Sequence, residues 1–236
     1  MNLAIFDIDG TLTETNAVDE ICFVQAFADA HAITEINTNW TEYEYVTDSG
    51  IMFQIFDERF GRPPDEDELM NFKSCLVNLL EAQREKNSSL FVEISGASRT
   101  LTGLNRETEW AVALATGCWR DSADLKLKAA GIPTEHLPAA FAEHGLSREA
   151  ILQTAVLHAQ QSYDQSRFER IVSVGDASWD VQAARNLGIA FLGIGKPDHE
   201  LRLRQVGASH VLENYSDYMQ FIECLGGAEV PHNESV

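Results

Sequence analysis

Residues 3–14 read LAIFDIDGTLTE, an apolar run that contains two aspartates and is then broken by a glycine and a threonine. A near-continuous apolar run is typical of a strand buried on both faces of a parallel sheet, so we expect a strand over residues 3–8. Asp7 and Asp9 stand at the end of that strand. Two carboxylates are costly in such a place unless they are paired with opposite charge and hydrogen-bonded, so their presence there suggests a chemical role. The segments that fold beside this strand decide what that role is.

Three later apolar runs repeat the pattern of the first strand: residues 110–117, 170–176 and 189–195. Helical periodicity separates them, and two of the helical segments end at Gly131 and Gly188, which are natural helix C-caps. Alternating strands and helices predict an α/β fold with a doubly wound parallel sheet and right-handed crossovers.

Residues 14–92 have a different pattern. Residues 19–33 and 65–83 carry apolar side chains at helical spacing, and no strand pattern of comparable strength lies between or beside them. We therefore expect a helical cap, residues 14–92, inserted directly after the first strand. The core domain would then consist of residues 1–13 and 93–236.

The chain of 236 residues is strongly acidic, with 17 Lys and Arg against 37 Asp and Glu and a formal net charge of −20. This charge opposes binding to a nucleic-acid backbone or to an anionic membrane, so we expect neither as a partner. No apolar run is long enough to span a bilayer, and no basic leader precedes the first strand. We expect a cytoplasmic protein.

Polar side chains follow three of the predicted strands: Asp7 and Asp9 the first, Thr116 and Gly117 the second, and Asp176 and Asp180 the third. Binding sites in open parallel sheets form at the carboxyl ends of the strands, so we expect these groups to share one crevice. Several carboxylates in one crevice repel one another or take up protons unless a cation neutralises them. Mg²⁺ is the natural choice, because it prefers oxygen ligands and shares them with phosphate.

Three motifs carry a resemblance to a known family. FDIDGT (residues 6–11) resembles DxDGT, LATG (114–117) resembles a hydrophobic strand ending in Thr/Ser-Gly, and GDASWD (175–180) resembles GDxxxD. In this order they identify the chain as similar to the haloacid dehalogenase-like (HAD) hydrolase superfamily. Its helical insertion is similar to the C1 caps of phosphoglycolate phosphatase and β-phosphoglucomutase-like members. The resemblance implies a Rossmann-like core under that cap.

The family's remaining motif is a single Lys or Arg, for which Arg148 in GLSREAIL is the candidate. Lys126 and Lys128 are alternatives, but DLKLK lies in the middle of a predicted helix and is more typical of a solvated face.

The resemblance implies a role for each matched residue. Asp7 would be the nucleophile that forms an aspartyl-phosphate, and Asp9 the general acid and base. The residues expected to hold the phosphoryl group are Gly10, Thr11, Thr116, Gly117 and Arg148. Mg²⁺ would be held by Asp7, Asp176 and the backbone carbonyl of Asp9, with Asp180 acting through water or from behind these ligands.

Asp9 also separates activities within the family. A departing halide needs no proton, so a carboxylate two residues after the nucleophile argues for phosphate chemistry rather than dehalogenation.

Specificity is expected to lie in the cap. Thr47 and Asp48 are candidate specificity residues in a loop rich in aromatic and hydroxyl side chains, although the same residues also fit a helix cap. Arg120 is expected near the rim of the site, where it would help to offset phosphate charge.

These observations predict a Mg²⁺-dependent phosphomonoester hydrolase acting on a small phosphorylated metabolite, as a monomer or weak dimer. Two alternatives stay open: a phosphomutase of the same fold, and a non-hydrolytic phosphate-binding or signalling module. The identity of the metabolite is not determined by the sequence.

Overall fold

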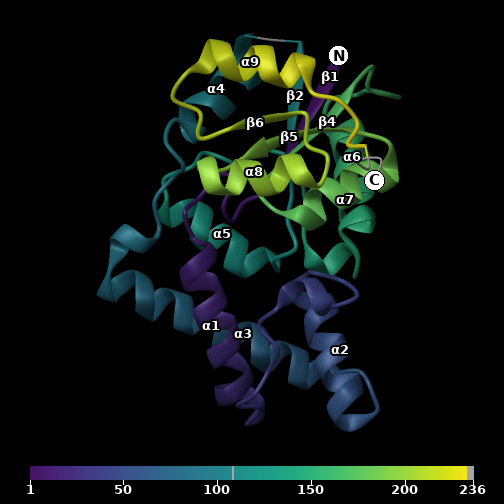
Figure 1. The fold of residues 1–236 in the computed structure, drawn as a ribbon. Helices are drawn as coiled ribbons and strands as arrows, with labels where there is room; N and C mark the ends of the chain where they lie inside the picture. The colour runs from purple at the N-terminus through teal and green to yellow at the C-terminus, as the bar shows by residue number, and fades with distance from the viewer. Residues whose placement is uncertain (108, 233–236) are drawn as a thin grey trace.

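The computed structural model describes residues 1–107 and 109–232, and in this part of the chain six parallel strands form one sheet (Figure 1). The strands are β1 (Asn2–Phe6), β2 (Trp110–Ala115), β3 (Ala139–Ala140), β4 (Ile171–Gly175), β5 (Ala190–Ile194) and β6 (His210–Leu212). Their order is β3-β2-β1-β4-β5-β6. The prediction of an α/β fold with a doubly wound parallel sheet is confirmed. The chain order reverses at β1, which pairs with both β2 and β4.

Helices cover both faces of the sheet: α4 (Ala97–Glu107), α5 (Arg120–Ala129), α6 (Arg148–Ser162), α7 (Ser178–Leu187), α8 (Pro197–Gln205) and α9 (Tyr218–Gly227). Alternate residues of a strand point to opposite faces. Phe6 of β1 accordingly packs in a buried cluster with α4, α5 and α9, whereas Leu3 and Ile5 pack against α6 and α7. A short 3-10 turn (Ala142–His144) precedes α6.

The segment between β1 and α4 is helical. It contains α1 (Asn16–His31), α2 (Asp48–Phe60) and α3 (Glu66–Lys86), with 3-10 turns at Trp40–Glu42 and Ser88–Leu90. In Figure 1 these helices lie together at the carboxyl side of the sheet. Asp65 and Glu68 form a reciprocal capping box at the start of α3. None of the helices among the described residues is long and apolar enough to cross a membrane.

The insertion has its own apolar cluster, built around Phe23, Phe27, Phe56 and Phe72. Trp119, from the loop after β2, packs into this cluster and so joins it to the sheet. The chain leaves and re-enters the core side by side, because Thr13 and Glu93 form an antiparallel bridge. We retain the domain boundary at residues 13 and 93 as a proposal, and this bridge supports it.

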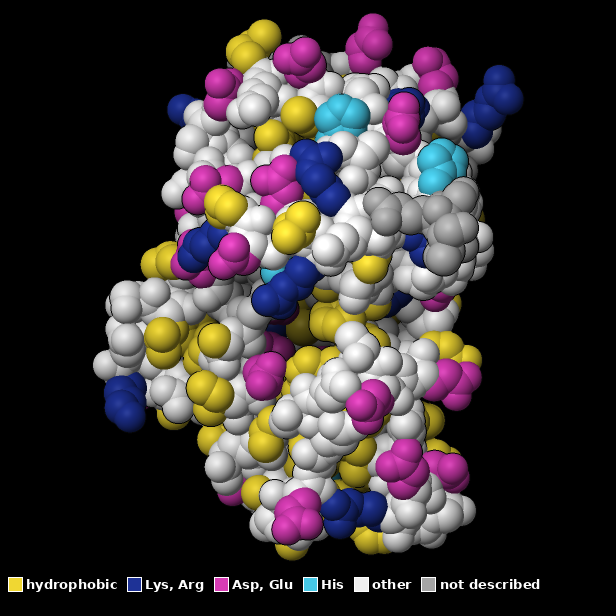
Figure 2. Space-filling view, in the orientation of Figure 1, with side chains coloured by type: hydrophobic (Ala, Val, Ile, Leu, Met, Phe, Trp, Pro, Cys, Tyr) yellow, Lys and Arg dark blue, Asp and Glu magenta, His cyan; other side chains and the backbone are white. Residues whose placement is uncertain are grey.

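Figure 2 shows the surface hollowed between the sheet-containing part and the helical insertion, with Asp and Glu side chains scattered over both parts. The carboxyl ends of the central strands lie at this junction, so the fold brings the strand-end aspartates under the insertion.

Candidate active site

A cavity of about 280 Å³ lies between the carboxyl ends of β1, β2 and β4 and the helical insertion. The core lines it with Asp7, Asp9, Thr116, Gly117, Cys118, Arg148, Asp176, Ala177, Trp179 and His199. The insertion lines it with Asn16, Asp19, Glu20, Phe23, Trp40, Val46, Asp48 and Ile51. The three strand ends that the sequence predicts to share one crevice do lie together, as expected for an open parallel sheet.

The first group at this site is an acidic trio, Asp7, Asp176 and Asp180, of which Asp7 and Asp176 line the cavity. One carboxylate oxygen from each lies within 4.8 Å of the others. Arg148 Nη1 lies 3.1 Å from Asp7 Oδ1 and 3.3 Å from Asp180 Oδ1. Asn16, from α1, donates a 2.9 Å hydrogen bond to Asp176 Oδ2. Arg148 therefore contacts two of the three carboxylates, Asp7 and Asp180.

Burial dominates the electrostatics of the trio. It raises the pKa of Asp7 to about 7, although Arg148 acts in the opposite direction. Burial, followed by the charges of Asp180 and Asp7, raises the pKa of Asp176 well above its usual value. Burial also raises the pKa of Asp180, against the effect of Arg148. One arginine does not compensate three buried carboxylates, so the trio favours a further cation.

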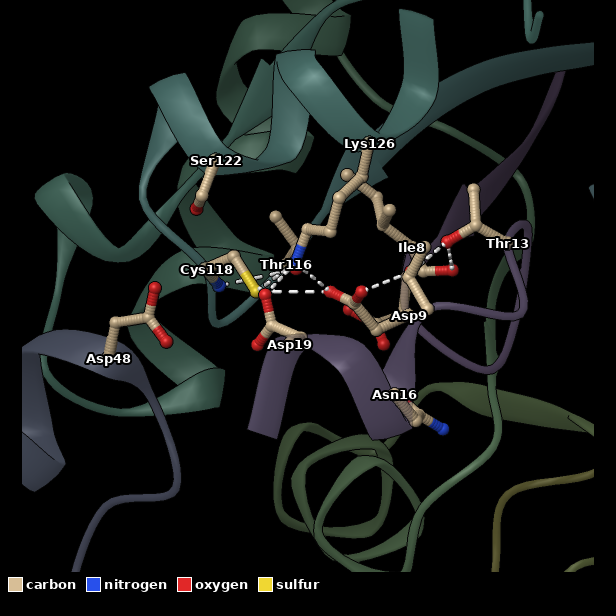
Figure 3. A network of polar contacts seen from close by, with 12 residues as sticks. Ile8, Asp9, Thr13, Asn16, Asp19, Asp48, Thr116, Cys118, Ser122 and Lys126 are labelled. Atoms are coloured by element: carbon tan, nitrogen blue, oxygen red, sulfur yellow. Dashed lines mark hydrogen bonds and ion pairs between the residues drawn. The ribbon is translucent and has the colours of Figure 1, made fainter. Parts of the chain in front are cut away.

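The second group surrounds Asp9, and we call it the Lys126 network (Figure 3). Lys126 Nζ lies 2.6 Å from Asp9 Oδ2 and 2.6 Å from Asp19 Oδ1. Cys118 Sγ lies 3.1 Å from Asp9 Oδ2 and 3.2 Å from Lys126 Nζ. Thr15 donates to the other oxygen of Asp9. Residues from α5, from the loop after β2 and from the N-cap of α1 therefore all contact the Asp9 carboxylate.

The position of Lys126 corrects the sequence interpretation. Its side chain is 0% exposed, whereas the sequence pattern DLKLK is typical of a solvated face. It lies on the buried stripe of α5 together with Ala123 and Leu127. Lys128 is exposed, as expected. Arg148 contacts the trio and Lys126 contacts Asp9, so each of the two groups of carboxylates has its own cation.

Within the Lys126 network, the pKa of Asp9 shifts in the opposite direction from the pKa values of the trio. Burial alone would raise the pKa of Asp9, but the charge and hydrogen bond of Lys126 lower it below its usual value. Burial would lower the pKa of Lys126, yet Asp19 and Asp9 raise it well above its usual value. Asp9 is therefore held as a carboxylate and Lys126 as an ammonium.

The turn after Asp9 requires glycine. Gly10 has φ +71°, and a Cβ there would lie 2.0 Å from Asp176 Oδ2. Thr11 is buried and its hydroxyl has no hydrogen-bond partner among the described residues. Neither residue lines the cavity, whereas Thr116 and Gly117 do. The Thr116 hydroxyl accepts a 3.2 Å hydrogen bond from the backbone N–H of Cys118.

The three candidate specificity residues have different positions. Thr47 is the N-cap of α2, where it accepts from Gly50, and its hydroxyl donates to the Leu146 carbonyl at 2.7 Å. Asp48 lines the cavity and accepts a 2.9 Å hydrogen bond from the backbone N–H of Trp119.

Arg120 does not lie at the rim of the cavity. Its guanidinium carbon lies 4.2 Å from the ring centroid of Phe141, and Arg120 is absent from the cavity lining. The expected position at the rim was wrong, because the side chain stacks on this ring instead.

The cavity residues that the sequence interpretation missed include Asn16, Asp19, Trp40 and His199. Asn16 and Asp19 lie in the first turn of α1, which follows closely after the FDIDGT motif. This closeness in the sequence could have identified them as residues of the site. His199 contacts the Asp176 carbonyl from α8, and nothing in its local sequence indicates this contact.

Comparison with known proteins gives the family. A model described as haloacid dehalogenase-like hydrolase matches residues 4–194. The search of curated proteins found no match.

Solved structures share the fold. A hydrolase from Pseudomonas syringae is 20% identical with a TM-score of 0.69, covering 94% of this chain and 98% of that one. CbbY from Rhodobacter sphaeroides in complex with phosphate is 17% identical with a TM-score of 0.66, covering 91% and 95%. A putative β-phosphoglucomutase from Thermotoga maritima is 17% identical with a TM-score of 0.57, covering 94% and 99%. Since the matched family model spans most of the chain, the protein belongs to the haloacid dehalogenase-like hydrolases.

Proposed function

We propose that this hydrolase cleaves phosphomonoesters of small metabolites, with Mg²⁺ as cofactor and an aspartyl-phosphate formed on Asp7. The observation that carries the proposal is that the two carboxylates that follow β1 have different surroundings. Asp7 belongs to the acidic trio, whereas Asp9, two residues later in the chain, is bound by Lys126. Phosphoryl transfer through an enzyme carboxylate needs these two functions, a nucleophile and a group that moves protons.

The donor set of the trio fits Mg²⁺. It offers oxygen ligands from buried carboxylates close to one another, and Arg148 leaves their charge incompletely neutralised. We propose Asp7, Asp176 and the backbone carbonyl of Asp9 as ligands, with Asp180 acting through water or supporting them from behind. When bound, the ion would neutralise charge on the trio and on the phosphoryl group.

Asp7 is the proposed nucleophile. Its carboxylate oxygen would attack phosphorus as the bond from phosphorus to the leaving oxygen breaks, and water would later hydrolyse the aspartyl-phosphate. Arg148 is held for this step from two sides, because its Nε donates to the Val46 carbonyl at 2.9 Å while Nη1 contacts Asp7. A guanidinium fixed in this way can stabilise the charge that develops on the phosphoryl oxygens.

Asp9 is the proposed acid and base. It would give a proton to the leaving oxygen and later accept one from the attacking water. Because Lys126 holds it ionised, Asp9 is ready to act as the base, and must first take up a proton to act as the acid. Thr116, which lines the cavity, is the proposed contact of a phosphoryl oxygen.

The insertion supports this chemistry by closing over the site. The backbone N–H of Asp48 donates to the Gly117 carbonyl at 2.7 Å, and Thr47 donates to the Leu146 carbonyl. These contacts hold the start of α2 against the strand ends, and a closed cavity strengthens the electrostatic interactions of a bound phosphoryl group with the residues around it. The phosphate complex of Rhodobacter sphaeroides CbbY, a protein of the same fold, is consistent with phosphate handling here.

The test is inorganic phosphate release from a panel of small phosphomonoesters and p-nitrophenyl phosphate, with Mg²⁺ and with EDTA. We expect metal-dependent release that falls by about 10³-fold or more in Asp7→Asn. Asp9→Asn should lose about 10²- to 10⁴-fold on alkyl esters and less on p-nitrophenyl phosphate, whose leaving group needs no proton. Release that survives in Asp7→Asn, or no release from any ester by folded protein, would contradict the proposal. Conversion of a sugar phosphate into its isomer without phosphate release would identify the phosphomutase alternative.

A further inference from the structure

The end of the cavity formed by the insertion is negatively charged. Asp19, Glu20 and Asp48 line it, and Asp9 faces it from the core. Among the cavity-lining residues, Arg148 is the only Lys or Arg, and it contacts the acidic trio at the other end. The Lys126 ammonium is already in contact with both Asp9 and Asp19. Four carboxylates at this end are therefore matched by one buried ammonium.

Asp48 is the most buried of these carboxylates. It is 8% exposed, and one of its oxygens, Oδ2, accepts the Trp119 backbone N–H. Its other oxygen has no hydrogen bond or ion pair among the described residues. In Figure 3 Asp48 lies apart from the dashed contacts that join Asp9, Asp19 and Lys126. Burial, followed by the charge of Asp19, raises the pKa of Asp48 well above its usual value, as expected for an unmatched carboxylate.

Aromatic side chains accompany these acids. The Trp40 indole N–H donates a 3.1 Å hydrogen bond to Glu20 Oε2, which fixes the ring beside that carboxylate. Trp40 packs edge to face on Phe23, with 6.1 Å between ring centroids. Both rings line the cavity. Carboxylates beside aromatic rings are the surroundings that favour an ammonium group.

We propose that the substrate is the phosphomonoester of a small amine-bearing alcohol, such as an amino alcohol or an amino sugar, with its ammonium bound by Asp48. The inference rests on the proposed phosphatase function and adds the chemical class of the leaving group. A substrate with a second phosphate would place that anion among carboxylates that lack a free cation, and like charges in such a site are strongly unfavourable. The same charges therefore oppose a bisphosphate substrate.

The test compares esters that differ only in charge. Glucosamine 6-phosphate is paired with glucose 6-phosphate, and phosphoethanolamine with ethylene glycol monophosphate; glucose 1,6-bisphosphate supplies the anionic case. In at least one of the two pairs, we expect kcat/KM to be at least about tenfold higher for the amine ester than for its neutral partner. We expect the lowest kcat/KM for the bisphosphate. Equal rates within both pairs, or faster cleavage of the bisphosphate, would overturn the inference.

A pair of variants assigns the preference to Asp48. Asp48→Asn keeps an acceptor for the Trp119 N–H, so it should fold, and the ratio of kcat/KM between amine and neutral ester should fall towards one. Asp57→Asn makes the same change at an exposed position of α2 and should leave the ratio unchanged. An unchanged ratio in Asp48→Asn would overturn the assignment.

Hydrolysis of p-nitrophenyl phosphate distinguishes failure of the proposed phosphatase function from failure of the inference about the amine. If it is hydrolysed in an Asp7-dependent way while the amine esters show no advantage, only the inference about the amine fails. If no ester is hydrolysed, the proposed function fails and the inference fails with it.

Discussion

Asp7 and Asp9 are two residues apart on one strand end, yet their surroundings are opposite. Asp7 shares a small volume with two other carboxylates and one arginine, all supplied by the core. Asp9 is bound by a fully buried lysine that also contacts Asp19 of α1, which belongs to the insertion. The surroundings of Asp7 raise its pKa, whereas those of Asp9 lower its pKa.

This difference shows how one strand end supports two kinds of chemistry. The acidic trio has more negative charge than its neighbours offset, so it favours an added cation. The Lys126 network has a buried ammonium of its own, and that ammonium links the core to the insertion. Buried charges of this kind are strongly destabilising when one partner is removed.

The largest effect on stability is expected from removing the ammonium. Lys126→Met leaves Asp9 and Asp19 as buried carboxylates without their cation, and we expect it to reduce the free energy of unfolding by about 3–5 kcal/mol. Urea denaturation measures the change. Lys128→Met, two residues along the same helix at an exposed position, should change stability by no more than about 0.5 kcal/mol. Equal effects of the two variants would mean that the network does not exist in solution.

The pH dependence of stability should distinguish the two carboxylates. The folded pKa of Asp7, about 7, lies above its unfolded value near 3.8, so the folded state binds the extra proton between these values. In metal-free protein this contribution makes stability fall as pH rises from about 4 to 7, by at most about 1.4 kcal/mol per pH unit. Asp9 has the opposite sign: its contribution is present above the unfolded pKa and is lost as pH falls through the lower folded pKa.

Urea midpoints in EDTA across this pH range check the sign. Asp7→Asn should make the decrease from about pH 4 to 7 shallower, since one of the groups with a raised pKa no longer titrates. A decrease of the same slope in Asp7→Asn and in wild type would show that Asp7 is not the group responsible.

The smallest effect is expected at the edge of the Lys126 network. Cys118→Ala removes the thiol that contacts Asp9 Oδ2, and we expect a loss of about 1 kcal/mol of stability. Cys118→Ser, which keeps a donor, should lose less. Thermal unfolding with the partly exposed Cys75→Ala as a control measures both; a larger loss in Cys118→Ser than in Cys118→Ala would contradict this contact.

The main strands and the acidic strand ends could be predicted because their signals are local. The apolar runs at residues 3–8 and 170–176 mark strands buried on both faces, and the aspartates that end them belong to the same few residues. β3 and β6 were not predicted, since strands of two and three residues carry too little pattern.

The Lys126 network could not be predicted because its contacts are not local. Lys126 meets Asp9 and Asp19 across more than a hundred residues of chain. Its place three residues after Ala123, on the apolar stripe of α5, was the one local signal. Arg120 shows the same limit, since its interaction with Phe141 depends on how the chain returns after β3.

Titration of Mg²⁺ into the protein by calorimetry tests the division between the two groups most directly. Wild type should bind Mg²⁺, Asp176→Asn should lose at least about tenfold in affinity, and Asp19→Asn should keep the wild-type affinity. That result would place the cation at the acidic trio and leave the Lys126 network to position Asp9. Failure of wild type to bind Mg²⁺, or an equal loss in Asp19→Asn and Asp176→Asn, would contradict the account.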